Sequence, residues 1–96
     1  MELSKSDIVL STAGRDKNLL FYVMDVKEEM VLIANGKERK LEHPKWKKLK
    51  QVRKVARSES RIAAKIRCDE RVLNSELRKD LAIYRQQLNC HHQGGS

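Results

Sequence analysis

Short apolar runs are separated by polar, turn-forming segments over the first half of the chain. The apolar runs occupy residues 7–12, 19–26 and 30–34. They are rich in β-branched and aromatic residues and are separated by turn-forming residues, as is typical of short strands. Asn35 and Gly36 form the pair best suited to a two-residue type I′ turn. The pattern therefore predicts a hairpin in which Ala34 faces Lys37, with a polar returning strand at 37–42.

Pro44, the only proline, is expected to end this polar strand, because proline lacks the amide hydrogen that a ladder requires. Residues 47–55 then place Leu49, Val52 and Val55 among cations at a spacing of three. This segment is compatible with a basic helical turn or with a closing strand. We favour a turn that leads into a short strand.

After residue 57 the apolar spacing becomes that of helices. Ser58 is a suitable N-cap and predicts a helix over 58–67. A second helix is expected to start at Asn74, followed by an apolar stripe at i, i+4, i+7 and i+11 that consists of Leu77, Leu81, Tyr84 and Leu88. The stripe either packs on its own chain, which we favour, or binds a ribosomal protein or a second copy of the chain.

Charge is concentrated in one segment. The 96 residues have a net charge of +8, which suggests a polyanionic partner. Residues 1–36 hold four Lys or Arg against six Asp or Glu, residues 37–57 hold ten against two, and residues 58–96 hold seven against five. The excess therefore lies in residues 37–57. A local basic stripe on a small domain is the electrostatic footprint of nucleic-acid binding.

Three segments together resemble a KOW domain: "STAGRDK" at 11–17, "ANGKERKLEHPK" at 34–45 and "KKLKQV" at 47–52. The resemblance covers residues 5–53. It is to the bacterial KOW-domain RNA-binding proteins that are similar to the archaeal and eukaryotic large-subunit ribosomal proteins fourteen, six and twenty-seven. Gly14 matches the signature glycine of the family. Asn18 stands where a second glycine is common, which asparagine can replace because it tolerates the left-handed conformation.

The resemblance implies a small five-stranded SH3-like barrel that binds RNA, usually ribosomal RNA. We therefore expect a mainly β fold, with the barrel at 1–57, a helical extension packed on it at 58–90 and a flexible tail at 91–96. The residues predicted to contact RNA are Arg15, Lys17, Lys37, Arg39, Lys40, Lys45, Trp46, Lys47, Lys48 and Lys50. Trp46 either stacks on a base or belongs to the core.

The expected function is non-catalytic RNA binding by a monomer associated with the ribosome, mainly through phosphates. The alternative is an SH3-like protein-interaction module that recognises an acidic partner. No motif for nucleotide binding, metalloprotease chemistry or a nucleophile elbow is present, so we expect no enzyme activity and no small-molecule substrate.

Neither a cofactor nor a metal is expected. Cys90 and His91 are adjacent and Cys68 lies far upstream, which is not the paired spacing of structural zinc sites. The sequence shows neither an export signal nor an apolar run that could span a membrane, so a cytoplasmic location is expected.

Overall fold

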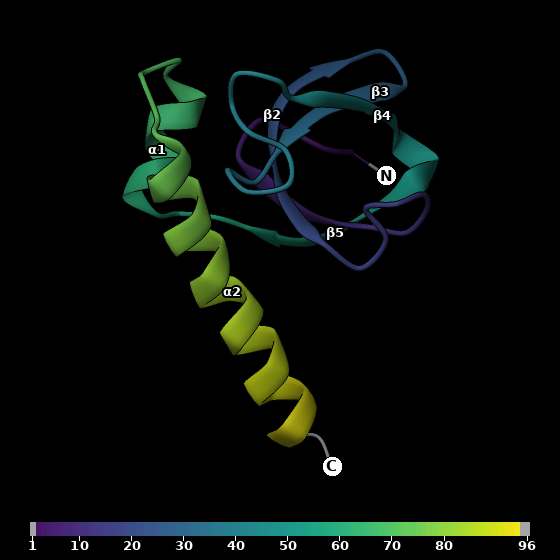
Figure 1. Ribbon diagram of the computed structural model, residues 1–96, viewed down its shortest axis with the longest axis vertical. Helices are drawn as coiled ribbons and strands as arrows, with labels where there is room; N and C mark the ends of the chain where they lie inside the picture. The colour runs from purple at the N-terminus through teal and green to yellow at the C-terminus, as the bar shows by residue number, and fades with distance from the viewer. Residues whose placement is uncertain (1, 95–96) are drawn as a thin grey trace.

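The structure is a computed structural model that describes the backbone of residues 2–94 and the side chains of residues 2–88. Its five strands are β1 (Asp7–Ser11), β2 (Leu20–Lys27), β3 (Met30–Ala34), β4 (Lys45–Lys48) and β5 (Val52–Arg57). They form one antiparallel sheet in the order β4-β3-β2-β1-β5, and the 3-10 turn η1 (Leu49–Gln51) joins β4 to β5. Two helices follow, α1 (Arg61–Arg67) and α2 (Asn74–Gly94), as Figure 1 shows. The predicted mainly β fold with a helical C-terminal part is confirmed.

The sheet bends without closing into a barrel. Its register shifts between Ile8 and Val9 on β1 and between Val23 and Asp25 on β2, and such bulges increase local twist and bending. Figure 1 shows β3 and β4 above β5, with β2 running from one level to the other. Within residues 2–94 no ladder joins β4 to β5. Both strands therefore remain sheet edges.

Each face of the sheet buries its own apolar cluster, because successive side chains of a strand point to opposite faces. The concave interior holds Leu3, Val9, Phe21, Val23, Val31, Ile33 and Val52. The other face packs against the helices through Ile8, Leu20, Tyr22, Ala34, Ala63, Ile66, Leu77 and Leu81. The sheet and the helices thus share the second of these two clusters.

The helix boundaries refine the predictions. Ser60, and not Ser58, caps α1, and its Oγ accepts a hydrogen bond from the Ala63 amide at 3.1 Å. Helix α2 starts at Asn74 as predicted and continues to Gly94, past the boundary predicted at residue 90. Residues 95–96 of the predicted tail lie outside the described part of the chain.

The apolar stripe of α2 packs on its own chain in its first half, as we favoured. Leu77 is fully buried and Leu81 is 6% exposed. Tyr84 is half-buried, whereas Leu88 is 40% exposed. Figure 1 shows the reason, because the later turns of α2 extend past the sheet.

A buried polar network fastens α2 to the sheet. The Tyr22 hydroxyl lies between Ser58 and Asp80: it donates to the Asp80 carboxylate, and its oxygen is 2.9 Å from Ser58 Oγ. Ser60 Oγ also donates to Asp80, at 2.8 Å, and the Tyr84 hydroxyl donates to Ser58 at 3.1 Å. Burial, and then the bond to Asp80, raises the pKa of Tyr22 above its ordinary value.

The predicted Asn-Gly hairpin is wrong. Strand β3 pairs instead with β4, with Met30 opposite Lys48 and Ile33 opposite Lys45. Residues 37–42 form turns and not a strand, and Pro44 precedes a strand where it was expected to end one. Asn35 organises this connection, because its Oδ1 accepts hydrogen bonds from the amides of residues 37 and 39 at 3.0 and 2.9 Å.

Candidate nucleic-acid interface

The ten residues predicted to contact RNA lie in two environments. Three cations are buried or paired with the buried carboxylate of Asp16: Arg39, Lys45 and Lys47. Six cations are exposed: Arg15, Lys17, Lys37, Lys40, Lys48 and Lys50. The last of the ten, Trp46, is also exposed. The predicted basic stripe is therefore not one continuous array.

Lys47 points into the protein. It is 4% exposed, and its Nζ donates a hydrogen bond of 2.6 Å to the Ala13 carbonyl. Burial lowers the pKa of its ammonium group below the ordinary value, while the Asp16 carboxylate acts in the opposite direction. The ammonium group of Lys47, which was predicted to contact phosphate, is thus buried and holds the loop between β1 and β2.

Asp16 gathers two more of the predicted cations. Its side chain is 6% exposed, with Lys45 Nζ at 3.1 Å from Oδ2 and Arg39 Nε at 3.7 Å from Oδ1. Arg39 Nε is buried without a hydrogen-bond partner among the described residues. One carboxylate therefore balances part of the charge of Lys45, Arg39 and Lys47. Sequence reasoning missed this role of Asp16, although a lone acid inside a basic loop was the available signal.

The loop between β1 and β2 contains two residues in the left-handed conformation. Gly14 and Asn18 both have positive φ, at 78° and 73°. The Asn18 amide donates to the Ser11 carbonyl at 2.8 Å, and the Lys17 amide donates to the Gly14 carbonyl at 3.2 Å. These bonds make the loop compact and leave the side chains of Arg15 and Lys17 exposed.

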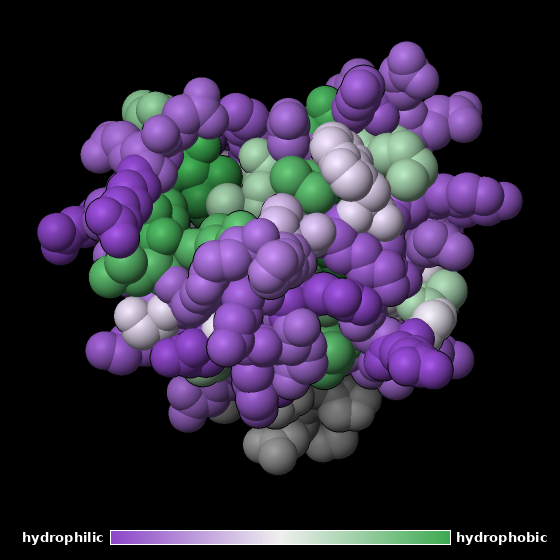
Figure 2. Space-filling view, turned by 45° about the horizontal axis from the view of Figure 1, so that its top comes forward, coloured by the Kyte–Doolittle hydropathy of each residue, from purple (hydrophilic) through white to green (hydrophobic). Residues whose placement is uncertain are grey.

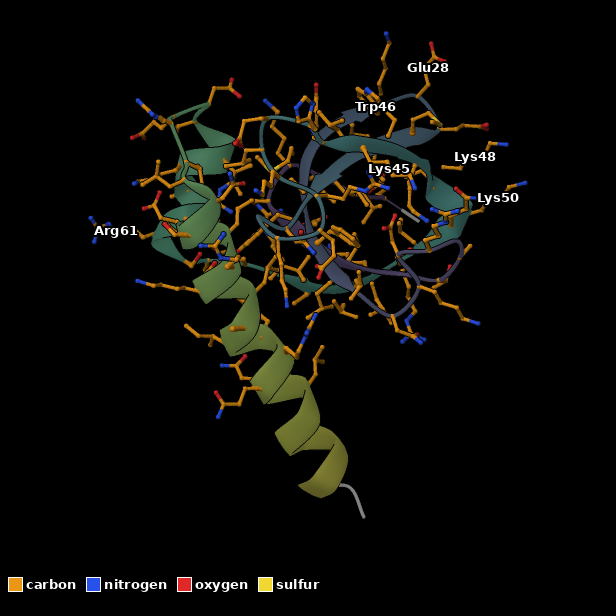
Figure 3. The ribbon with its side chains drawn as sticks, viewed as in Figure 1. Glu28, Lys45, Trp46, Lys48, Lys50 and Arg61 are labelled. Carbon is orange, nitrogen blue, oxygen red and sulfur yellow. The ribbon has the colours of Figure 1, made fainter. Side chains whose placement is uncertain are left out.

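Trp46 lies on the outer face of β4. It is 40% exposed, and its cross-strand partner is the half-buried Leu32 of β3. The next outward residue is Lys48, opposite Met30. This placement excludes the indole from the core and leaves it beside an exposed ammonium group. Figure 3 shows Trp46, Lys48 and Lys50 on the side of the molecule opposite Arg61.

This side also contains acidic groups. Glu28, Glu29, Lys48 and Lys50 border a hollow of about 680 Å³ between the β2–β3 turn and η1. The Leu49 amide donates to the Glu29 carbonyl at 2.9 Å and fixes η1 against that turn. No ion pair within residues 2–94 joins these acids to the lysines. With two cations and two carboxylates, the hollow itself is not an anion-binding site.

No model of a known protein family matches the chain, and no curated protein matches it. In the part of the chain that the structure describes, no cluster of three or more His, Cys, Asp or Glu side chains could hold a metal ion. The side chains of Cys90 and His91, weighed above as zinc ligands, lie outside that part. Neither described helix combines the length and apolar character needed to cross a bilayer.

Proposed function

We propose that this protein binds RNA without catalysing a reaction, through a surface around β4 and the adjoining β1–β2 loop. We call this the β4 surface, and it comprises Arg15, Lys17, Trp46, Lys48 and Lys50. Loop and strand are adjacent because Lys47 of β4 holds the Ala13 carbonyl and because the Thr12 amide donates to the Gln51 carbonyl at 2.9 Å.

The exposed indole of Trp46 beside Lys48 is the observation on which the proposal mainly rests. An aromatic ring on a strand surface stacks on a nucleotide base, and stacking contributes about 1 to 3 kcal/mol per base. Ammonium groups nearby attract the phosphates, and binding them releases counterions. The resemblance to KOW domains supports the same ligand class and makes ribosomal RNA in the cytoplasm the first target to test.

Fluorescence anisotropy with a labelled single-stranded RNA, measured over a salt series, tests the proposal. The four cations of the β4 surface, Arg15, Lys17, Lys48 and Lys50, are exposed and have no ion-pair partner within residues 2–94. If all four contact phosphate, log K should fall against log salt with a slope of about −2.8. Absence of binding at low salt would refute the proposal.

Charge reversals separate a defined surface from general attraction. Lys48→Glu should weaken binding strongly, and its matched control Arg61→Glu, on the opposite side in Figure 3, should have a small effect. Trp46→Ala should weaken binding by about 5- to 150-fold, since one stacked base contributes about 1 to 3 kcal/mol. Melting temperatures of the two charge reversals should stay close to wild type, because both of these side chains are exposed. Equal weakening by the two reversals would contradict a defined surface.

Protein binding at the same surface is the second candidate. Met30, Leu32 and Trp46 form an apolar row on an edge of the sheet, which an extended segment of a partner could cover. Co-sedimentation with ribosomes before and after ribonuclease treatment distinguishes the two candidates. Association that survives complete RNA digestion would favour the protein partner.

A further inference from the structure

A basic depression lies on the other side of the loop that follows β3. It is a hollow of about 380 Å³ between this loop and the first half of α2. Its rim contains Lys37 and Glu38 from the loop and Arg78, Arg85 and Gln86 from the helix. Three cations thus face one carboxylate. None of the cations on the helix belongs to the predicted RNA-binding residues.

The two walls of this groove are locked together. Gly36 has φ of +78°, and a Cβ at that position would lie 2.3 Å from the Asn74 carbonyl oxygen at the start of α2. Arg78 Nη1 donates to the Gly36 carbonyl at 2.9 Å, and Asn74 Oδ1 accepts from the Leu41 amide at 2.8 Å. The groove is therefore pre-formed, and a ligand would not have to order it.

Most of the positive charge in the groove is available to a ligand. The Glu38 carboxylate accepts a hydrogen bond of 2.8 Å from the Asn35 side-chain amide. Lys37 Nζ is 3.9 Å from the same carboxylate, and the side chains of Lys37 and Glu38 are both exposed. A contact of this kind is weak in water. Within residues 2–94, Arg78 and Arg85 have no carboxylate partner. The net charge of the rim is +2, which favours an anion.

The spacing of the two arginines suits a chain of phosphates. Arg78 and Arg85 are seven residues apart and therefore lie on the same side of α2, two turns apart. The small side chain of Ala82 lies between them along the groove. Guanidinium groups present planar forks of N–H donors that match phosphate oxygens.

We propose that this groove is a second phosphate-binding site and that one RNA strand occupies both the groove and the β4 surface. The loop after β3 borders both regions, because Lys37 and Glu38 line the groove while Arg39 reaches Asp16 of the β1–β2 loop at 3.7 Å. An RNA strand that crosses this loop would meet cations on either side of it. The inference rests on the proposed function, because it assumes the same RNA ligand.

Arg85→Gln tests the groove, with Lys79→Gln as its control. Lys79 is an exposed cation of the same helix but does not line the groove. On an RNA of about 16 nucleotides, the long end of the site sizes known for small single-strand-binding folds, Arg85→Gln should weaken binding about tenfold. It should also reduce the magnitude of the salt slope by about 0.7. Lys79→Gln should change neither quantity.

Length dependence shows whether one strand spans both sites. On a shorter RNA that cannot reach from the β4 surface to the groove, Arg85→Gln should have less than about a twofold effect. Arg78 stays unchanged because it supports the loop, and unaltered melting temperatures verify that the variants fold. Equal affinities of Arg85→Gln and Lys79→Gln for the long RNA, with Lys48→Glu still impaired, would overturn this inference and leave the proposed function intact. Failure of wild type to bind either RNA would refute both.

Discussion

Lys47→Met separates a structural lysine from an RNA-contacting one. The methionine side chain keeps the unbranched apolar stem but removes the ammonium group that donates to the Ala13 carbonyl at 2.6 Å. The carbonyl keeps one partner, because Ser11 Oγ donates to it at 3.1 Å. Asp16 likewise keeps Lys45 and Arg39. The substitution therefore leaves no orphaned buried acceptor.

Two opposing effects determine the magnitude. A hydrogen bond from a charged donor contributes about 1.5 to 3 kcal/mol to the free energy of unfolding. Against this, the variant no longer buries an ammonium group, a cost that is also seen in the lowered pKa of Lys47. The lost hydrogen bond should slightly outweigh the relieved burial of charge. We therefore expect Lys47→Met to lower the free energy of unfolding by about 1 kcal/mol, or the melting temperature by about 4 to 8 °C. Lys47→Glu should cost about 3 to 5 kcal/mol, because it buries a carboxylate beside Asp16.

Urea titration and RNA anisotropy on the same samples test this reasoning. Lys47→Met should bind RNA like wild type with an unchanged salt slope, because its ammonium does not face solvent. Its neighbour Lys48 supplies the matched control, since Lys48→Met should keep wild-type stability and lose affinity. The result that would refute the reasoning is a Lys47→Met variant with wild-type stability and a salt slope reduced by about 0.7.

Three further substitutions test the contacts of α2 with the rest of the domain, the first two by urea titration. Tyr22→Phe should cost about 1 to 3 kcal/mol at pH 7, because Asp80 loses a buried donor. Because the pKa of Tyr22 in the folded state is above the ordinary 10.0, its contribution to the free energy of unfolding is complete below pH 10. Above pH 10, the difference in unfolding free energy between wild type and Tyr22→Phe should shrink by about 1.4 kcal/mol per pH unit. A constant difference would contradict the assignment. Gly36→Ala should cost more than about 2 kcal/mol, because the methyl group would overlap the Asn74 carbonyl at positive φ, and wild-type stability would show that loop and helix are not locked. Leu81→Asp should abolish the folded state by circular dichroism, because it buries an unpaired charge, whereas a stable monomer would show that α2 does not dock on the sheet.

Strands β1, β2 and β3 could be predicted because short apolar runs between turn-forming residues indicate buried strands directly. In β1, for example, Ile8 and Val9 serve the two apolar clusters, one on each face of the sheet. The helix start at Asn74 and the buried Leu77 followed from spacing and from helix-start chemistry in the same way. These features depend on neighbours a few residues apart, which the sequence displays.

The hairpin and the environment of the cations depended on distant contacts. Asn35 and Gly36 favour a tight turn locally, but Gly36 instead meets the backbone of Asn74, which no local preference encodes. With the returning strand assigned to 37–42, the alternation of β4 could not be derived. Lys47 and Lys48 therefore appeared equivalent, although one points inward and the other outward.

The core shared by sheet and helices limits how this domain can be divided. Leu77 and Leu81 of α2 complete an apolar cluster with Ile8 and Tyr22 of the sheet. Cutting the chain after Arg57 would therefore expose the apolar face of the sheet that the helices cover. An excised segment of residues 1–57 should therefore aggregate, and grafting it into another protein would require its helices as well. Any deletion meant to map RNA contacts on α2 would remove folding determinants too, which makes point substitutions on its surface the sound approach.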